Sequence, residues 1–206
     1  MYYYKTAISN LFVKGTLDKI GEVDELWSLD CHGGASPDNQ RHNDKKPGPL
    51  LDALYWQGIQ TAASDDTQMA MVFEQSRLLG SPRLRMLKVH DRSCTVVKSF
   101  RREIQGCFGP YSESAEDRQP FGPANSSAFI YQTANKLETS SYWGAVSTYG
   151  GGGFVQYLTI DDRHASAHTI SQLKANRWVD RGTRAIFIDF VLYNANINLF
   201  CISQYV

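Results

Sequence analysis

Long hydrophobic runs are missing from this chain of 206 residues. No stretch of about 18 uncharged apolar residues occurs, so we expect no segment to cross a bilayer as a helix. The best candidate, residues 185–201, contains Asp189 and three asparagines. The first residues also lack the pattern of a secretory signal. If this domain lies outside the cytosol, we expect a part of the protein beyond this sequence to take it there.

An excess of either charge is also absent, because 21 lysines and arginines balance 21 aspartates and glutamates. This balance argues against a protein that binds nucleic acid through a basic surface. Apolar residues make up 42% of the chain and charged residues 20%, which is typical of a folded globular domain. The length suits one domain with a sizeable core, or two small ones.

Cysteine is scarce, with Cys31, Cys94, Cys107 and Cys201 as its four positions. Four are too few for a disulfide-dense scaffold, and the absence of a CxxC spacing argues against structural zinc. From the residues alone, Cys94 and Cys107 are either a disulfide pair or two free buried thiols. A disulfide closing a loop of this length would stabilise the fold by about 3 kcal/mol in the entropy model. No partner is assigned to Cys31.

Catalytic constellations are missing as well. The glycine run 150–153 is not followed by the Lys-Ser/Thr pair of a phosphate loop, so we interpret it as a flexible turn before a strand. His164 and His168 have a spacing that can bind zinc, on a helix capped by Asp161 or Asp162, but no third ligand can be named. A solvated histidine face is therefore favoured over a hydrolase that uses these four residues. We expect no enzymatic activity, no cofactor and no metal site.

What the chain does contain is a strongly patterned stretch at residues 178–201, WVDRGTRAIFIDFVLYNANINLFC. Side chains alternate between faces along a strand, and apolar residues here fill first the even and then the odd positions. A straight strand cannot change parity, so we predict a β-hairpin that turns near residues 193–196. One long bulged strand is the alternative. The even set is Ile186, Ile188, Phe190 and Leu192, and the odd set is Ala195, Ile197, Leu199 and Cys201.

Charged residues stand just before this hairpin, at Asp180, Arg181 and Arg184. They form either a polar turn with surface ion pairs, each worth about 0–1 kcal/mol, or a turn that these side chains hold against neighbouring elements. Both interpretations stay open at this point.

The remaining patterns predict a mixture of helices and strands. A break at residues 80–82 precedes a predicted strand at 83–89, and apolar residues at helical spacing predict a short helix within 97–104. A further strand is predicted at 154–160, followed by the helix with the two histidines. Residues 30–49 contain almost no apolar side chain and are expected to be a solvated loop. The class is α+β, an antiparallel β-sheet with helices packed on it and long loops.

Several motifs in the same order resemble the polycystin family of cation channels, in its polycystin-two branch within the TRP group. They are the stretch at 178–201, LLDALYW, LLGSPRLRMLKV, EDRQPFGPAN and the tyrosine run near the start. The resemblance implies one extracytosolic domain over residues 1–206, a fragment of a larger membrane protein that normally lies between the first and second transmembrane helices. The loop 30–49 would be an insertion relative to the family.

The resemblance also implies specific features. Cys94 and Cys107 match a disulfide pair, which requires an oxidising compartment, and Asn125 matches a glycosylation site. The implied protein is a calcium-permeable, non-selective cation channel of the cilium, plasma membrane or endoplasmic reticulum. Calcium would be its permeant ion and not a cofactor.

For assembly, the resemblance implies a homotetramer, or a heteromer with polycystin-one-like subunits, in which copies of this domain form a ring over the pore and contribute to gating. The alternative is an ectodomain that senses a ligand or an extracellular partner. The residues expected to serve structure and assembly are Trp178, Asp180, Arg181, Arg184, Asn194 and Asn196.

Overall fold

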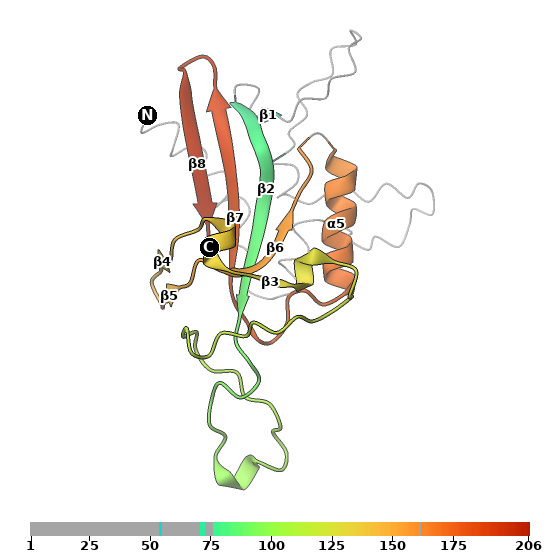
Figure 1. The fold of residues 1–206 in the computed structure, drawn as a ribbon, viewed down its shortest axis with the longest axis vertical. Coiled ribbons are helices and arrows are strands. Elements are labelled where there is room, and N and C mark those ends of the chain that lie inside the picture. Colours follow the sequence, from blue (N-terminus) through green and yellow to red (C-terminus); the bar gives the residue numbers. More distant parts are fainter. Residues whose placement is uncertain (1–53, 55–70, 73–75, 161) are drawn as a thin grey trace, which may run out of the picture. The chain divides into compact units, whose positions relative to one another are not determined.

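The computed structural model describes residues 54, 71–72, 76–160 and 162–206, and Figure 1 labels their helices and strands. Five strands follow one another in the order β3-β6-β2-β7-β8, β1 pairs with β2, and β4 and β5 form a separate two-stranded sheet. The β1–β2, β2–β6, β3–β6 and β4–β5 pairs are antiparallel, which confirms the predicted class. The strands are β1 (Met71–Val72), β2 (Ser76–Lys88), β3 (Tyr131–Gln132), β4 (Tyr142–Trp143), β5 (Thr148–Tyr149), β6 (Gly153–Tyr157), β7 (Thr183–Asn194) and β8 (Leu199–Tyr205), and the helices are η3 (Lys98–Phe100), η4 (Ser127–Phe129), α4 (Ala134–Leu137) and α5 (Arg163–Ala175).

The chain divides into two compact units, and the boundaries fall within β2, α5, β7 and β8. The first unit contains α5 up to Lys174 and the tip of the β7–β8 hairpin. Asp162 caps α5, since its Oδ1 accepts a hydrogen bond from the amide of Ala165 at 2.9 Å, as predicted for this residue. The helix buries Ile170 and Leu173. Other buried apolar side chains of this unit are Leu78, Leu158, Phe190 and Leu192.

The second unit contains the core next to the segments that matter for function. Tyr142 and Tyr149, from the β4–β5 hairpin, pack their rings against Phe187 of β7 at centroid distances of 5.6 and 5.9 Å. Such edge-to-face contacts hold the β4–β5 sheet against β7. The buried members of this cluster are Leu87, Val89, Tyr111, Ala115, Tyr149, Ala185 and Phe187.

The hairpin at the end of the chain is confirmed, and the bulged-strand alternative is wrong. β7 ends at Asn194, and β8 begins at Leu199 and runs beside it (Figure 1). One detail differs, because Ile186 was expected on the buried face and is only half-buried. Phe187 and Ile188 are both buried, at 0% and 5% exposure. The first half of β7 therefore buries its odd face, where the tyrosines of the small hairpin pack on Phe187.

The predicted break at residues 80–82 is also wrong, because β2 runs through it from Ser76 to Lys88. Gly80 has φ +72°, so it bends the strand in a conformation that other residues rarely adopt. Pro82 has no amide proton, yet its carbonyl accepts a hydrogen bond from the amide of Leu158 at 2.8 Å. The Gly and Pro signals mark a bend in a continuous strand.

The glycine run 150–153 leads into strand β6, as predicted, and it is a close-packed segment. Residues 151, 152 and 153 are buried. A Cβ on Gly151 would collide with the carbonyl of Thr139, and one on Gly152 would collide with the hydroxyl of Tyr131. These glycines are therefore required by the approach of neighbouring backbone and side chains.

Candidate functional site

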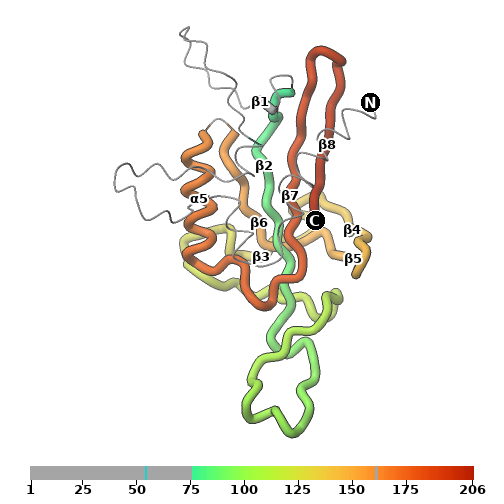
Figure 2. The backbone as a smooth tube through the Cα atoms, turned by 180° about the vertical axis from the view of Figure 1, so that it is seen from behind, coloured from blue at the N-terminus to red at the C-terminus, as the bar shows by residue number. Residues whose placement is uncertain are grey.

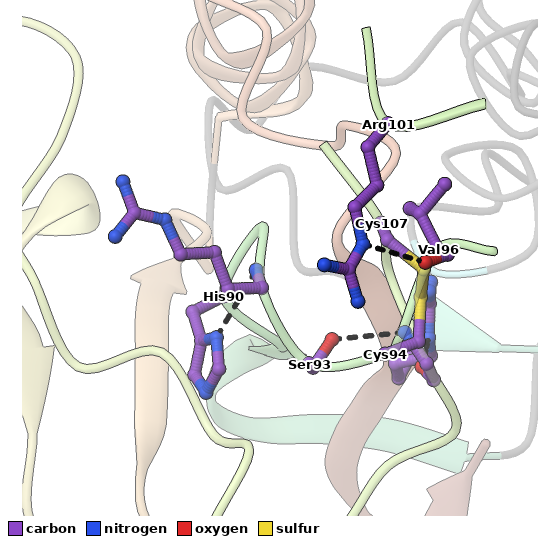
Figure 3. The surroundings of a disulfide bond; sticks show 9 residues. His90, Ser93, Cys94, Val96, Arg101 and Cys107 are labelled. Carbon is purple, nitrogen blue, oxygen red and sulfur yellow. Dashed lines mark hydrogen bonds between the residues drawn. A yellow bond between two sulfur atoms is a disulfide. The ribbon is translucent and has the colours of Figure 1, made fainter. Parts of the chain in front are cut away.

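The first feature of the candidate site is a loop closed by a disulfide. Cys94 and Cys107 are joined with a Cα–Cα distance of 5.3 Å, as the family resemblance implies (Figure 3). The base of the loop is tied further by backbone and side chain. The amide of Cys107 donates to the carbonyl of Asp91 at 2.7 Å, and Ser93 Oγ accepts from the amide of Gly109 at 2.8 Å. Residues 94–107, here called the disulfide loop, thus emerge from a fixed base.

Of the short helix predicted within residues 97–104, the structure has a 3-10 helix of three residues. Only η3 forms, and the three residues of the expected apolar stripe are exposed: Val97 at 68%, Phe100 at 53% and Ile104 at 47%. A short helix needs an apolar face packed against other elements, and no residue of η3 is buried. Figures 1 and 2 show the loop projecting beyond the end of β2. It therefore presents apolar side chains at its surface.

Basic side chains accompany these apolar residues. Lys98, Arg101 and Arg102 are exposed, and Glu103 is the one carboxylate of the loop. The Arg101 Nε donates to the carbonyl of Val96 at 3.1 Å, which holds part of the loop backbone in place. The disulfide loop thus combines apolar contact area with net positive charge.

A turn before β7 anchors the base of the disulfide loop. Arg184 Nε donates to the carbonyl of Gly109 at 2.7 Å, and its Nη1 donates to the carbonyls of Arg181 and Thr183. The guanidinium of Arg181 lies 5.8 Å from the ring centroid of Phe108. Both arginines therefore contact the residues that directly follow Cys107 in the chain.

Asp180 ties the same turn to β2. Its Oδ2 accepts a hydrogen bond from Lys88 Nζ at 2.8 Å, and its Oδ1 accepts from the amide of Gly182. The amide of Val89 in turn donates to the carbonyl of Gly182 at 2.9 Å. Of the two interpretations left open by the sequence, these contacts favour the turn held against neighbouring elements.

The other residues assigned to structure and assembly serve the fold itself. Trp178 is 1% exposed and donates from Nε1 to the carbonyl of Ala128 at 2.9 Å. Asn194 is buried, contacts Ser76 Oγ through Nδ2 at 3.4 Å, and accepts from the amide of Asn196 at 2.9 Å. This last bond is an Asx-type turn that closes the hairpin. Asn196 is exposed, whereas Trp178 and Asn194 are too buried to touch another molecule.

A buried polar network lies in the second unit, and sequence reasoning missed it. Arg85 of β2 is 0% exposed and donates from Nη1 to the carbonyls of Gly150 at 2.7 Å and Gly152 at 2.9 Å. Within the described part of the chain its Nε and Nη2 have no hydrogen-bond partner. The guanidinium lies 3.8 Å from the ring centroid of Phe187. Burial lowers the pKa of Arg85, although a guanidinium stays charged in proteins.

The carboxylate of Glu116 is the acidic member of this network. Tyr111 donates to its Oε2 at 2.8 Å, Tyr131 donates to its Oε1, and Arg118 Nη2 lies 3.7 Å from Oε2. Burial, together with the hydrogen bond to Glu116, raises the pKa of Tyr111 to about 12, and the pKa of Tyr131 is raised for the same reasons. Both phenols therefore stay protonated at neutral pH, where they act as hydrogen-bond donors to Glu116. No sequence signal marked Arg85, because β2 also contains Arg77, Arg83 and Lys88.

The remaining predicted sites are placed as follows. Asn125 is exposed, as a glycan acceptor must be, and His164 and His168 are exposed on α5. Asp161, Cys31 and the loop 30–49 lie outside the described residues. Within the described ranges, no three His, Cys, Asp or Glu side chains are grouped so that they could hold a metal ion. No helix found there has the length and hydropathy needed to cross a membrane.

Comparison with known proteins shows the family to which this chain belongs. A family model described as the Polycystin domain matches residues 47–206, so the chain belongs to the polycystin family. The chain is 43% identical over 210 residues to Polycystin-2 of Caenorhabditis elegans, covering 98% of this chain and 27% of that protein. It is 42% identical over 204 residues to Polycystin-2 of Danio rerio, covering 99% and 22%. It is 37% identical over 213 residues to human Polycystin-2-like protein 1, covering 100% and 24%. The chain thus spans about a quarter of the length of these relatives.

Proposed function

We propose that this chain is the extracytosolic domain of a polycystin-like, calcium-permeable, non-selective cation channel, in which it mediates tetramer assembly and contributes to gating. Family membership supports the proposal, and the remaining three quarters of a protein like its relatives would supply the membrane helices and pore. The domain would face the outside of the cell or the lumen of an organelle. A disulfide and an exposed acceptor at Asn125 suit that oxidising side.

The observation that carries the assembly role is the disulfide loop. It exposes three apolar side chains while its base is fixed by the disulfide and by Arg184. Exposed apolar clusters on soluble domains mark interfaces, and a surface ordered in advance loses little conformational entropy when it docks. The proposed partner is another subunit of the same assembly, a homotetramer or a heteromer with polycystin-one-like subunits.

The way the loop is attached supports a contribution to gating. Arg184 connects the loop base to the start of β7, and Asp180 connects the same turn to Lys88 at the end of β2. A displacement of the loop by a neighbouring subunit would therefore act on two central strands through short, charge-assisted hydrogen bonds. Because such bonds link discrete elements, the turn is suited to transmit a change in subunit packing.

Currents from the full-length protein test this proposal. Wild-type protein in planar bilayers is expected to conduct sodium, potassium and calcium, and Phe100→Ser with Ile104→Ser is expected to reduce current per purified subunit. The matched control is Ile130→Ser, which alters an apolar side chain exposed to a similar degree, 51%, outside the loop. A wild-type protein that carries no cation current under any condition would refute the channel function. Currents equal in all variants would refute the role of the loop.

A further inference from the structure

We propose that neighbouring copies meet through two different surfaces of this chain: the disulfide loop of one copy and the tip of the β4–β5 hairpin of the next. The hairpin tip is defined here as residues 143–147. The inference rests on the proposed tetramer and specifies which residues form its contacts.

Symmetry requires two surfaces. In a closed ring of four copies each subunit contacts one neighbour on each side, so every copy presents two different patches that are complementary to each other. A patch that contacts its own counterpart would instead close a dimer. The second unit exposes two apolar clusters separate in sequence, one in the disulfide loop and one at the hairpin tip.

The hairpin tip combines exposed apolar side chains with a well-held backbone, which suits a contact surface. Trp143 is 86% exposed and Val146 is 85% exposed. The tip is nevertheless fixed in place, because the amide of Gly144 donates to the carbonyl of Ser147 at 3.0 Å, and Trp143 pairs with Thr148 in the β4–β5 ladder. Tryptophan is among the residues that contribute most to binding when an interface covers them.

Charge favours contact between the two surfaces over contact of the loop with itself. The disulfide loop carries three cations and one carboxylate, so two loops placed together would repel. Residues 139–160, which include the hairpin tip, contain no charged residue at all. An exposed indole attracts guanidinium groups through its ring face, and the exposed apolar residues of the loop provide a matching contact. The Trp143 ring is thus suited to Arg101 or Arg102 of the neighbouring copy.

Cysteine crosslinking between two tagged forms of the full-length protein tests this pairing. One form carries Phe100→Cys and the other Trp143→Cys, so a product that contains both tags can form only between subunits. We expect that product after mild oxidation of the coexpressed forms, and a much lower yield when either form is expressed alone. The matched control replaces Trp143→Cys by Ile130→Cys, an exposed position outside both surfaces. Peptide mapping verifies that the native link between Cys94 and Cys107 is retained.

The outcomes separate the two proposals. A tetramer that yields the two-tag product at least several-fold above the Ile130 control supports the pairing. A tetramer without that excess overturns the pairing and leaves the proposed function standing. A tetramer in which either form crosslinks to itself equally well also overturns it, because the contact would then be between like surfaces. Unmodified protein that forms no tetramer refutes the proposed assembly itself.

Discussion

Replacement of Arg85 by methionine is expected to destabilise the fold strongly. Methionine fills much of the same space but donates no hydrogen bond, so the carbonyls of Gly150 and Gly152 lose the donor at 2.7 and 2.9 Å. An unpaired buried polar group costs about 1–3 kcal/mol. Removal of the cation also removes its favourable charge interaction with the carboxylates of Asp189 and, to a smaller extent, Glu116. We expect Arg85→Met to lower the free energy of unfolding by about 3–5 kcal/mol.

Urea unfolding of the isolated chain, followed by tryptophan fluorescence, measures this loss. The matched control is Arg77→Met, which removes an exposed cation from the same strand and is expected to change stability by less than about 0.5 kcal/mol. Since domains are stable by about 5–15 kcal/mol, the Arg85 variant should shift the unfolding midpoint far beyond experimental error. Unfolding free energies of the two variants within about 1 kcal/mol of each other would show that the hydrogen bonds of Arg85 do not stabilise the fold to this extent.

Three further predictions concern the loop and the phenols. Cys94→Ser is expected to lower the free energy of unfolding by about 3 kcal/mol in the entropy model, as seen by urea unfolding; no change on reduction of the wild type would contradict this. Arg184→Met is expected to lower the free energy of unfolding by about 1.5–3 kcal/mol and to speed amide hydrogen exchange at the base of the disulfide loop. Unchanged exchange rates there would show that Arg184 does not hold the loop base in place. Because the pKa of Tyr111 is raised in the folded state, the stabilisation that its protonated phenol provides is complete below pH 10 and is lost as the pH rises towards about 12. In Tyr111→Phe the free energy of unfolding should therefore fall less steeply over this pH range. Parallel plots of unfolding free energy against pH for the two proteins would contradict this.

Local patterning allowed the end of the fold to be predicted. The change of parity in residues 178–201 places a turn between two strands, and the structure has that turn between Asn194 and Leu199. The pattern could not give the exact buried set, because Phe187 is covered by tyrosines more than 35 residues earlier in the chain. Burial of this kind depends on tertiary contacts that periodicity does not contain.

Two other differences between prediction and structure have the same origin. Helical spacing in the disulfide loop predicted a helix, but apolar residues stabilise a helix only where another surface packs against them, and here Val97 and Phe100 face solvent. Gly80 and Pro82 were interpreted as a break, although a strand tolerates a bend where its hydrogen-bonding needs are met. In both segments the local pattern is present in the sequence, but the structure that forms depends on contacts with other parts of the chain.

The candidate site could be predicted only in part. The pairing of Cys94 with Cys107 came from the family resemblance, since spacing alone left free thiols open. The exposed hairpin tip and the buried contacts of Arg85 had no sequence signal that distinguishes them from ordinary strand residues. Exposure of Trp143 in particular contradicts what composition suggests, because most tryptophans are largely buried.

Subunit counting is the sharpest test of whether this domain assembles the protein into tetramers. Full-length protein carrying one fluorophore per chain is imaged as single molecules in a membrane, and bleaching steps are counted. We expect a maximum of four steps for the wild type, and mostly fewer for a variant with Phe100→Asp and Trp143→Asp that still folds and reaches the membrane. Single-step bleaching of the wild type, or four steps in both proteins, would contradict it.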